Sequence, residues 1–406
     1  MYQRLQKKSV LILGYGREGK DTHRFLRSQF PSKEIAIADL KEKEVTDSKT
    51  ALYFGEDYLD AARDYDLIIK SPGVPYTFLA QKNISPNKIT SQSDIFLNLT
   101  EGEVIGITGT KGKSTTATAI HQLFKNQGVE SFLIGNIGNP ALDFLGKKAV
   151  FVYELSSFQL QTISRGPDLA IILNIFKDHL DQHSDYDEYF NSKKKIISFY
   201  PKPKKVIFNG GSEEVGRMVS DFEGEKIPFD PKERLAGSVV YADPIRKVAD
   251  HYGIDPEGVD QIIKDPPKLK HRLEFVGNYG GIDFYDDSAA TIPEATIRAI
   301  AGLETETLIT GGVDKGGDYK KLSLRIENSN IKNLILFPDT GKKIANSFSG
   351  NIFFVGSMEE AVKKAFQITN EGAVLLSPAS SSFNMFSSYV DRGDKFKKAI
   401  QKYGQK

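Results

Sequence analysis

The chain has 406 residues, of which 39% are hydrophobic and 26% charged, a composition typical of a globular protein with two or three domains. A formal net charge of +1 gives no general attraction to nucleic acid or to an acidic membrane, and the lack of cysteine excludes disulfides, thiolate nucleophiles and zinc-thiolate sites. The N-terminal segment has no apolar signal region and no run is long enough to cross a membrane, so we expect a cytoplasmic protein.

Short apolar runs alternate with helical patterns along the whole chain. Most runs are apolar throughout and do not alternate between apolar and polar residues, as expected for strands covered on both faces. They predict parallel α/β sheets. The predicted strands are residues 10–13, 35–38, 67–69, 104–107, 149–153, 169–173, 206–209, 334–337, 352–355 and 374–376. Breaks near residues 90–93 and 266–268 predict three α/β domains, at residues 1–92, 93–268 and 269–406.

A full G-x-G-x-x-G pattern, Gly14, Gly16 and Gly19, follows the first predicted strand, and Asp39 ends the next one. Alone, this pattern predicts a dinucleotide site and an NAD-dependent oxidoreductase. The plainer alternative is a tight turn between a strand and a helix. The next domain argues against NAD, because it contains a triphosphate-binding motif for which a dehydrogenase has no use.

That motif is the segment G-I-T-G-T-K-G-K-S-T at residues 106–115, between a predicted strand and a helix predicted at residues 114–127. Glycines let backbone N–H groups close around phosphate oxygens, and the helix N-terminus adds positive potential. Lys113 can reach the outer phosphates, and the Ser114 hydroxyl can ligate Mg²⁺. The strict P-loop has a glycine where this chain has Ile107, so the motif is a variant. An ordinary glycine-rich turn is the alternative.

Further motifs follow downstream: G-N-I-G at 135–138, E-L-S-S-F-Q-L at 154–160, Asn174, D-H-L-D at 178–181, and Tyr189 with Lys193. Together with T-G-T-K-G-K-S-T they resemble the Mur ligase family and its folylpolyglutamate synthetase relatives. Taken singly, Glu154 could be a solvated carboxylate, His179 a loop histidine and Lys193 part of a charged surface run. Their shared order and spacing favour one site.

The resemblance implies an ATP-dependent acid–amide ligase. Such an enzyme moves the γ-phosphoryl group of ATP onto a carboxylate, and an amine then attacks the acyl phosphate. Two Mg²⁺ ions and a lysine, Lys113, offset the repulsion between the anionic groups. Ser114 and Glu154 offer the oxygen ligands that Mg²⁺ prefers. The family pattern implies that His179 binds the second metal and that Lys193 is carbamylated.

The C-terminal third carries H-R-L-E at 271–274, G-G-V-D-K at 311–315 and L-S-P-A-S-S-S-F at 376–383. This combination resembles the glutamate-adding members of the family. It implies that Arg272 and Asp287 bind ATP. It also implies a glutamate pocket, in which a cation suits a carboxylate and hydroxyl donors suit its second oxygen; its residues are Thr291, Lys315, Ser382 and Tyr389. For Ser380 and Ser381 we expect a flexible polar loop.

The resemblance also implies the roles of the domains. The first would be Rossmann-like and bind a UDP-linked precursor, the second would bind ATP, and the third would be a Rossmann-like domain that binds glutamate. The implied precursor contacts are Gly14, Tyr15, Gly16, Arg17, Asp39, Ser71, Gly73, Asn136, Ser156 and Gln159. The implied ATP contacts in the central domain are Gly109, Thr110, Lys111, Gly112, Lys113, Ser114 and Thr115. The implied reaction adds D-glutamate to UDP-N-acetylmuramoyl-L-alanine in peptidoglycan synthesis, by a monomer with only small-molecule partners.

The chain departs from the family pattern in two places. Ala289 and Ile292 stand where the family has a lysine and an asparagine, and residues 237–241 replace its H-N-x-x-N segment. These changes leave open the glutamate isomer, the nucleobase contacts, and another amide ligase of the superfamily. A nucleotide-binding regulator without turnover is a further alternative, against which the intact Lys113, Glu154, His179 and Lys193 argue.

Overall fold

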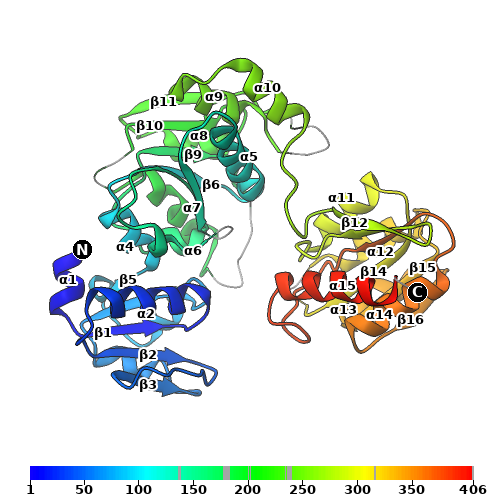
Figure 1. Cartoon of the computed structure of the whole chain (residues 1–406), viewed down its shortest axis with the longest axis horizontal. Helices are drawn as coiled ribbons and strands as arrows, with labels where there is room; N and C mark the ends of the chain where they lie inside the picture. Colours follow the sequence, from blue (N-terminus) through cyan, green and yellow to red (C-terminus); the bar gives the residue numbers. More distant parts are fainter. Residues whose placement is uncertain are drawn as a thin grey trace. The chain divides into compact units, whose positions relative to one another are not determined.

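The computed structural model describes residues 1–135, 139–176, 183–199, 201, 203–233, 235, 240–314 and 317–404. It divides into two compact units, Met1–Pro267 and Lys268–Lys406 (Figure 1). In the described residues, the first unit contains two parallel sheets and the second contains one mixed sheet. The predicted α/β class with parallel sheets is confirmed, whereas the predicted boundary at residue 92 lies inside the first unit and stays a prediction. No helix in the described part of the chain is long and apolar enough to cross a membrane.

The first sheet has the strand order β3-β2-β1-β4-β5, all parallel. Its strands are β1 (Val10–Leu13), β2 (Ile35–Asp39), β3 (Thr50–Phe54), β4 (Leu67–Lys70) and β5 (Ile89–Thr90). Its helices are α1 (Tyr2–Lys7), α2 (Arg17–Gln29), η1 (Asp60–Arg63), α3 (Tyr76–Gln81) and η2 (Pro86–Lys88). The strand order reverses between β1 and β4, so the crevice for a ligand lies beyond the carboxyl ends of these two strands.

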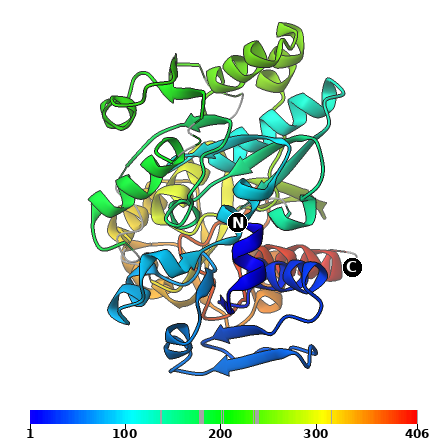
Figure 2. The same ribbon diagram turned by 90° about the vertical axis from the view of Figure 1, so that its left-hand side faces the viewer.

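The central sheet follows in the same unit, with the order β11-β10-β9-β6-β8-β7, all parallel. Its residues are coloured cyan to green in Figure 2. Its strands are β6 (Glu103–Thr108), β7 (Ser131–Gly135), β8 (Val150–Glu154), β9 (Leu169–Ile172), β10 (Lys205–Asn209) and β11 (Glu225–Phe229). Its helices are α4 (Gln92–Leu99), α5 (Lys113–Asn126), η3 (Ala141–Phe144), α6 (Ser157–Leu160), α7 (Tyr186–Lys194), η4 (Lys195–Ile197), α8 (Glu213–Val219), α9 (Asp243–Tyr252) and α10 (Pro256–Lys264).

The register of the central sheet brings three strand ends together. Ile107 of β6 pairs with Glu154 of β8, and Thr108 pairs with Ile172 of β9. The turn after β6, the carboxylate at the end of β8 and the segment after β9 therefore meet at one edge of the sheet. The apolar side chains of α5, α9 and α10 form one core, and a second core continues into the first sheet.

The C-terminal sheet has the order β12-β13-β17-β14-β15-β16. Its strands are β12 (Glu274–Tyr279), β13 (Ile282–Asp286), β14 (Thr305–Gly312), β15 (Asn333–Asp339), β16 (Asn351–Phe354) and β17 (Ala373–Leu376). Its helices are α11 (Pro293–Gly302), α12 (Tyr319–Glu327), α13 (Thr340–Ile344), η5 (Ala345–Ser347), α14 (Met358–Ile368) and α15 (Tyr389–Tyr403). The sequence did not predict the antiparallel edge pair β12–β13, which turns through Gly280 and Gly281, both at positive φ, as a two-residue hairpin requires.

Candidate active site

The turn after β1 is shaped by close backbone packing. Gly14 has φ +88°, and Ser71, which follows β4, donates its hydroxyl to Gly14 O at 2.6 Å. A Cβ at Gly19 would overlap the carbonyl oxygen of Gly14, whereas a Cβ at Gly16 would meet nothing within 4 Å. Asp39 Oδ2 accepts the backbone N–H of Tyr15 at 2.7 Å. The predicted turn residues therefore share the crevice of the first sheet, and the turn is open at Gly16.

This packing predicts opposite outcomes at two glycines of one motif. We expect Gly19→Ala to lower the free energy of unfolding by about 2 kcal/mol, because overlap with a backbone carbonyl outweighs the gain in helix propensity. Gly16→Ala is the matched control, since Gly16 is exposed and has φ −81°, and it should change stability by less than about 1 kcal/mol. Urea unfolding of both variants measures the difference, and equal stabilities would contradict the described packing.

The glycine-rich turn between β6 and α5 has the conformation that the sequence predicts. Gly109 and Gly112 have φ +152° and +89°, which strongly favours glycine at both positions. Asn174, just after β9, holds the turn through its amide: the Lys111 N–H donates to Asn174 Oδ1 at 2.8 Å, and Asn174 Nδ2 donates to Lys111 O at 2.9 Å. The sequence motif contained Asn174, but its positioning role was not predicted.

Two lysines distant in sequence converge on one carbonyl of this turn. Lys113 Nζ donates to Gly109 O at 2.9 Å and to Thr110 O at 3.1 Å. Lys193 Nζ donates to the same Gly109 O at 3.0 Å and lies 5.0 Å from the centre of the Tyr189 ring. Tyr189 is also bonded to the turn, since its hydroxyl lies 2.7 Å from Thr110 Oγ1. The P-loop, Lys113 and Lys193 therefore belong to one site.

Two oxygen-bearing side chains lie beside these lysines at the ends of neighbouring elements. Ser114 in the first turn of α5 donates to Glu154 Oε1 at the end of β8, at 3.2 Å. Both residues are buried. A hydroxyl and a carboxylate at this distance fit the oxygen donors of Mg²⁺ next to a phosphate-binding turn. Glu154 is thus not a solvated surface carboxylate.

Burial also distinguishes Lys193 from its neighbours. Lys193 is 2% exposed, whereas Lys194 and Lys195 are partly exposed. Lys194 pairs with Asp221 at 2.9 Å. The position chosen from the spacing after Tyr189 is therefore the one that faces the site, and Lys193 is not part of a solvated charge run.

Residues predicted for the precursor lie where the two sheets of the first unit meet. Ser156 and Gln159 form a capping box at the start of α6. Gln159 Nε2 donates to Glu18 Oε1 of α2 at 3.0 Å, and Arg17 Nη2 donates to Gly135 O at the end of β7, also at 3.0 Å. Gly73 lies in the exposed turn after β4. These contacts connect the turn of the first sheet with the central sheet.

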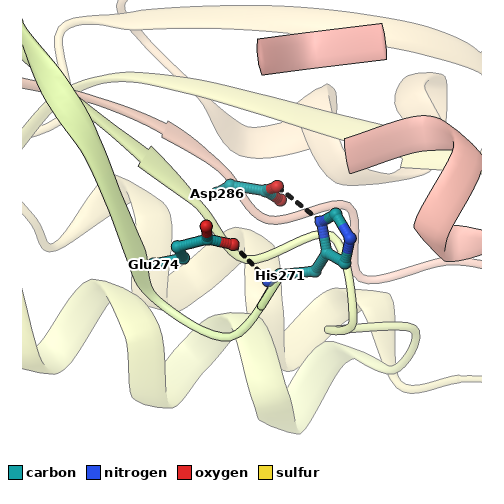
Figure 3. Close-up of side chains that lie close together, drawn as sticks. All are labelled: His271, Glu274 and Asp286. Carbon is teal, nitrogen blue, oxygen red and sulfur yellow. Dashed lines mark hydrogen bonds and ion pairs between the residues drawn. The ribbon is translucent and has the colours of Figure 1, made fainter. Parts of the chain in front are cut away.

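In the C-terminal unit, His271, Glu274 and Asp286 lie close together (Figure 3). His271 Nδ1 lies 2.7 Å from Asp286 Oδ2, and its backbone N–H donates to Glu274 Oε2 at 2.7 Å. One potential ligand atom from each lies within 4.8 Å of the others, a spacing that a metal ion could use. However, Lys397 Nζ donates to both oxygens of Glu274, at 2.8 and 2.6 Å, and lies 3.7 Å from Asp286. An ammonium group already compensates these charges, so we interpret the cluster as an ion-pair network.

This network holds the loop that carries Arg272. His271 and Leu273 have φ +63° and +44°, and Arg272 between them is exposed. Asp287 Oδ1 accepts the Leu273 N–H at 3.2 Å, and its Oδ2 accepts the Ser377 hydroxyl at 2.7 Å. Burial raises the pKa of Asp287 to about 7, although both hydrogen bonds favour its ionised form. Arg272 is thereby presented to solvent from an anchored turn.

A buried arginine, missed from the sequence, joins the loops that carry the predicted glutamate residues. Arg392 in α15 donates to Ser288 Oγ at 2.9 Å, to Ser288 O at 2.8 Å and to Ser380 O at 3.1 Å. The Ser288 hydroxyl in turn donates to Tyr389 O at 2.7 Å. Thr291, Ser382 and Tyr389 lie on these connected segments. No local sequence signal marks Arg392, because its partners are distant in the chain.

The expectation of a flexible polar loop at Ser380 and Ser381 was wrong. Both serines are buried. Ser380 Oγ lies 2.7 Å from Thr340 Oγ1, and Ser381 exchanges backbone hydrogen bonds with Val313. This serine run therefore packs into the C-terminal unit as a fixed wall.

Comparison with known proteins relates the chain to one family. Residues 107–241 match the Mur ligase middle domain, and residues 271–380 match the Mur ligase glutamate ligase domain. The UDP-N-acetylmuramoylalanine--D-glutamate ligase of Thermoanaerobacter sp. (strain X514) is 31% identical in an alignment that covers 98% of each chain. The chain belongs to the Mur ligase family. The ligase of the same name from Thermotoga petrophila is also 31% identical and covers 97% of this chain and 98% of its own.

Solved structures show the Mur ligase fold as well. UDP-N-acetylmuramate-alanine ligase MurC from Thermotoga maritima has a TM-score of 0.62 at 16% identity and covers 97% of this chain and 99% of its own. MurF from the same organism, in complex with ADP, has a TM-score of 0.57 at 16% identity and covers 98% of this chain and 97% of its own. At this identity the likeness concerns the fold alone.

Three of the site residues predicted for this Mur ligase lie outside the described residues. They are Asn136, His179 and Lys315, and the segment 236–239, which replaces most of the family's H-N-x-x-N pattern, lies outside them too. The remaining predicted residues of the first unit gather at two connected places, the crevice of the first sheet and the glycine-rich turn of the central sheet. In the C-terminal unit, Arg272 lies on the loop held by the His271 network. The segments joined by Arg392 carry the other described site residues, Asp287, Thr291, Ser382 and Tyr389.

Proposed function

We propose that this Mur ligase uses ATP to join D-glutamate to UDP-N-acetylmuramoyl-L-alanine, a step of peptidoglycan precursor synthesis. The observation that carries the proposal is the convergence of Lys113 and Lys193 on Gly109 O, beside the buried Ser114–Glu154 pair. Relatives that match the whole chain at about the same length are named as ligases of this reaction. Family membership favours this function over the NAD-dependent oxidoreductase.

In this proposal the central sheet of the first unit carries the site for ATP and Mg²⁺, which Mur ligases use. The backbone of residues 109–112 surrounds the phosphates, and Lys113 turns from its loop carbonyls to the γ-phosphoryl group. Ser114 and Glu154 would hold one Mg²⁺, and His179 with a carbamylated Lys193 would hold a second. When bound, the metals neutralise the phosphate charge as the acyl phosphate forms.

The other two substrates have separate proposed positions. The UDP part of the precursor would lie over the open turn at Gly16, with Asp39 and Ser71 on either side. Asn136, Ser156 and Gln159 would contact its more distal portion. The incoming glutamate would bind Thr291, Lys315, Ser382 and Tyr389. Arg272 and Asp287 would contribute to binding ATP.

The reaction is tested by incubating the full chain with ATP, Mg²⁺, UDP-N-acetylmuramoyl-L-alanine and either isomer of glutamate. Phosphate release and the mass of the product are followed. We expect a higher kcat/KM for D-glutamate. A single misplaced contact changes such discrimination by only about 1–3 kcal/mol, so Ala289 in place of the family lysine makes the comparison informative. A preference for L-glutamate would overturn the isomer but not the reaction class, and no phosphate release with either isomer would overturn the function.

Lys315→Ala should raise the KM for glutamate far more than the KM for ATP. The reason is that a cation pairing with a glutamate carboxylate belongs to one substrate only. Lys342→Ala is the matched control, because Lys342 is an exposed lysine of the same unit. Initial rates at varied glutamate and varied ATP separate the two constants. Equal changes in both KM values would argue against the proposed role of Lys315.

A further inference from the structure

The carboxyl edge of the central sheet extends to both sides of the glycine-rich turn. On the side of β8 and β7 lie Glu154 and the contact of Arg17 with Gly135 that leads to the first sheet. On the other side lie the ends of β9, β10 and β11. In the proposed function the γ-phosphate of the nucleotide faces the metal and the precursor on the β8 side. The base is the opposite end of the nucleotide, so it extends toward β10 and β11.

Two residues before α9 connect the glycine-rich turn with this part of the edge. A Cβ at Gly112 would lie 3.7 Å from both methyl carbons of Val240, so Val240 packs against the start of α5. The next residue is Tyr241, whose hydroxyl accepts a hydrogen bond from Asn209 Nδ2 at the end of β10, at 3.3 Å. Its ring centre lies 5.1 Å from that of Phe229 at the end of β11. Tyr241 therefore covers the ends of β10 and β11 directly beside the turn.

The Tyr241 ring is supported by the core and still reaches solvent. Phe229, which packs against it, is 1% exposed, whereas Tyr241 itself is partly exposed. The hydrogen bond from Asn209 holds the far end of the ring in place. An aromatic side chain that is fixed in this way can stack on a base, and stacking does not depend on which base is present because every base has a π-face.

The amide beside this ring is committed to contacts within the protein. Asn209 Nδ2 donates to Leu173 O at 3.0 Å as well as to Tyr241, and its Oδ1 accepts the Gly211 N–H at 3.0 Å. Adenine has an amino donor at the position where guanine has a carbonyl acceptor, so a protein group must accept or donate there to distinguish them. The donors of Asn209 are used already. This amide therefore stabilises the ring of Tyr241 and does not read the base edge.

We propose that Tyr241 binds the nucleobase by stacking and that this ligase therefore uses GTP nearly as well as ATP. The inference rests on the proposed function, since it takes the nucleotide phosphates to lie in the glycine-rich turn. The family pattern has an asparagine at position 241, so the stacking contact and the broad nucleotide preference are features of this chain.

The first test compares initial rates of phosphate release by the full chain with varied ATP or varied GTP, at fixed Mg²⁺, UDP-N-acetylmuramoyl-L-alanine and D-glutamate. We expect the two values of kcat/KM to agree within about tenfold, because stacking tolerates both purines. A larger preference for either nucleotide would overturn the inference, since it would show that hydrogen bonds read the edge of the base.

Two substitutions of Tyr241 separate the ring from its hydroxyl. Tyr241→Ala should raise the KM for ATP and the KM for GTP by about tenfold each and change kcat little, because the lost contact is made equally before and during the reaction. Tyr241→Phe keeps the ring and should restore most of the affinity. Tyr2→Ala is the control, since Tyr2 is an exposed tyrosine in α1. If Tyr241→Phe is as impaired as Tyr241→Ala, the bond to Asn209 matters and the stacking role is wrong.

Calorimetric titration of the full chain with ADP or GDP in the presence of Mg²⁺ measures the base contact without turnover. Similar dissociation constants support the inference, even if the chain ligates no glutamate and the proposed function fails. Binding of ADP without GDP would overturn the inference and leave the ligase function standing. If neither nucleotide binds, the inference and the proposed ATP site are both wrong. Thermal melts confirm that the compared variants are equally folded.

Discussion

Lys113→Ala is expected to abolish ligation and to leave the fold intact. Lys113 Nζ donates to two carbonyls of its own loop and the residue is partly exposed, so truncating its side chain leaves the apolar core of the sheet in place. Losing a preorganised cation at a transferring phosphoryl group costs about 3–4 kcal/mol, or a few hundredfold in rate. Phosphate release in the presence of all substrates measures the loss.

The control for this variant is Lys125→Ala, an exposed lysine in the last turn of the same helix. It should keep wild-type turnover, and both variants should unfold at wild-type temperature. Near-normal phosphate release from folded Lys113→Ala would show that the glycine-rich turn does not bind the transferred phosphate in the proposed way.

Lys193→Ala is expected to be nearly inactive and to recover part of its activity with added formate or acetate. In the proposed site the carbamate of Lys193 supplies oxygen ligands to a metal, and a short carboxylate can occupy the space left by the truncated side chain. Turnover measured over a series of carboxylate concentrations tests both parts. Chloride at equal ionic strength should give no recovery.

The neighbouring lysine provides the matched comparison. Lys194 pairs with Asp221 away from the glycine-rich turn, so Lys194→Ala should have a mild effect. Lys195→Ala should also be mild, but it is a less clean control because Lys195 Nζ donates to the carbonyl of Gln161. A larger loss at Lys194 than at Lys193 would place the functional lysine one residue later.

The sequence predicted those strands that are apolar on both faces. Every predicted strand overlaps an observed one, and the helix predicted at 114–127 is α5, Lys113–Asn126. The missed strands differ in the reason why local composition does not mark them. The edge strand β3 has an exposed middle, β12 is a half-exposed antiparallel edge, and β14 is rich in threonine and glycine. In these strands sheet neighbours, not local composition, decide the conformation.

Of the candidate site, local motifs predicted the residues for which we propose a chemical role. The left-handed glycines 109 and 112 and the buried Lys193 were readable from spacing and residue type. The residues that position the loops of the candidate site were not predicted, because their partners are remote in the sequence. Asn174 bonds to Lys111, 63 residues away, and Arg392 bonds to Ser288, 104 residues away. Such pairs exist only after the strands have been ordered in a sheet.

The three hydrogen bonds of Arg392 have a consequence for engineering. They make the segment after β13, the segment after β17 and the first turns of α15 into a single assembly, with no lysine able to replace the planar guanidinium. Grafting one of these segments from a ligase with another amino-acid preference would put at risk the Ser288 hydroxyl and the positions of the two backbone carbonyls that accept from the buried guanidinium. A successful exchange of specificity would have to transplant all three segments together.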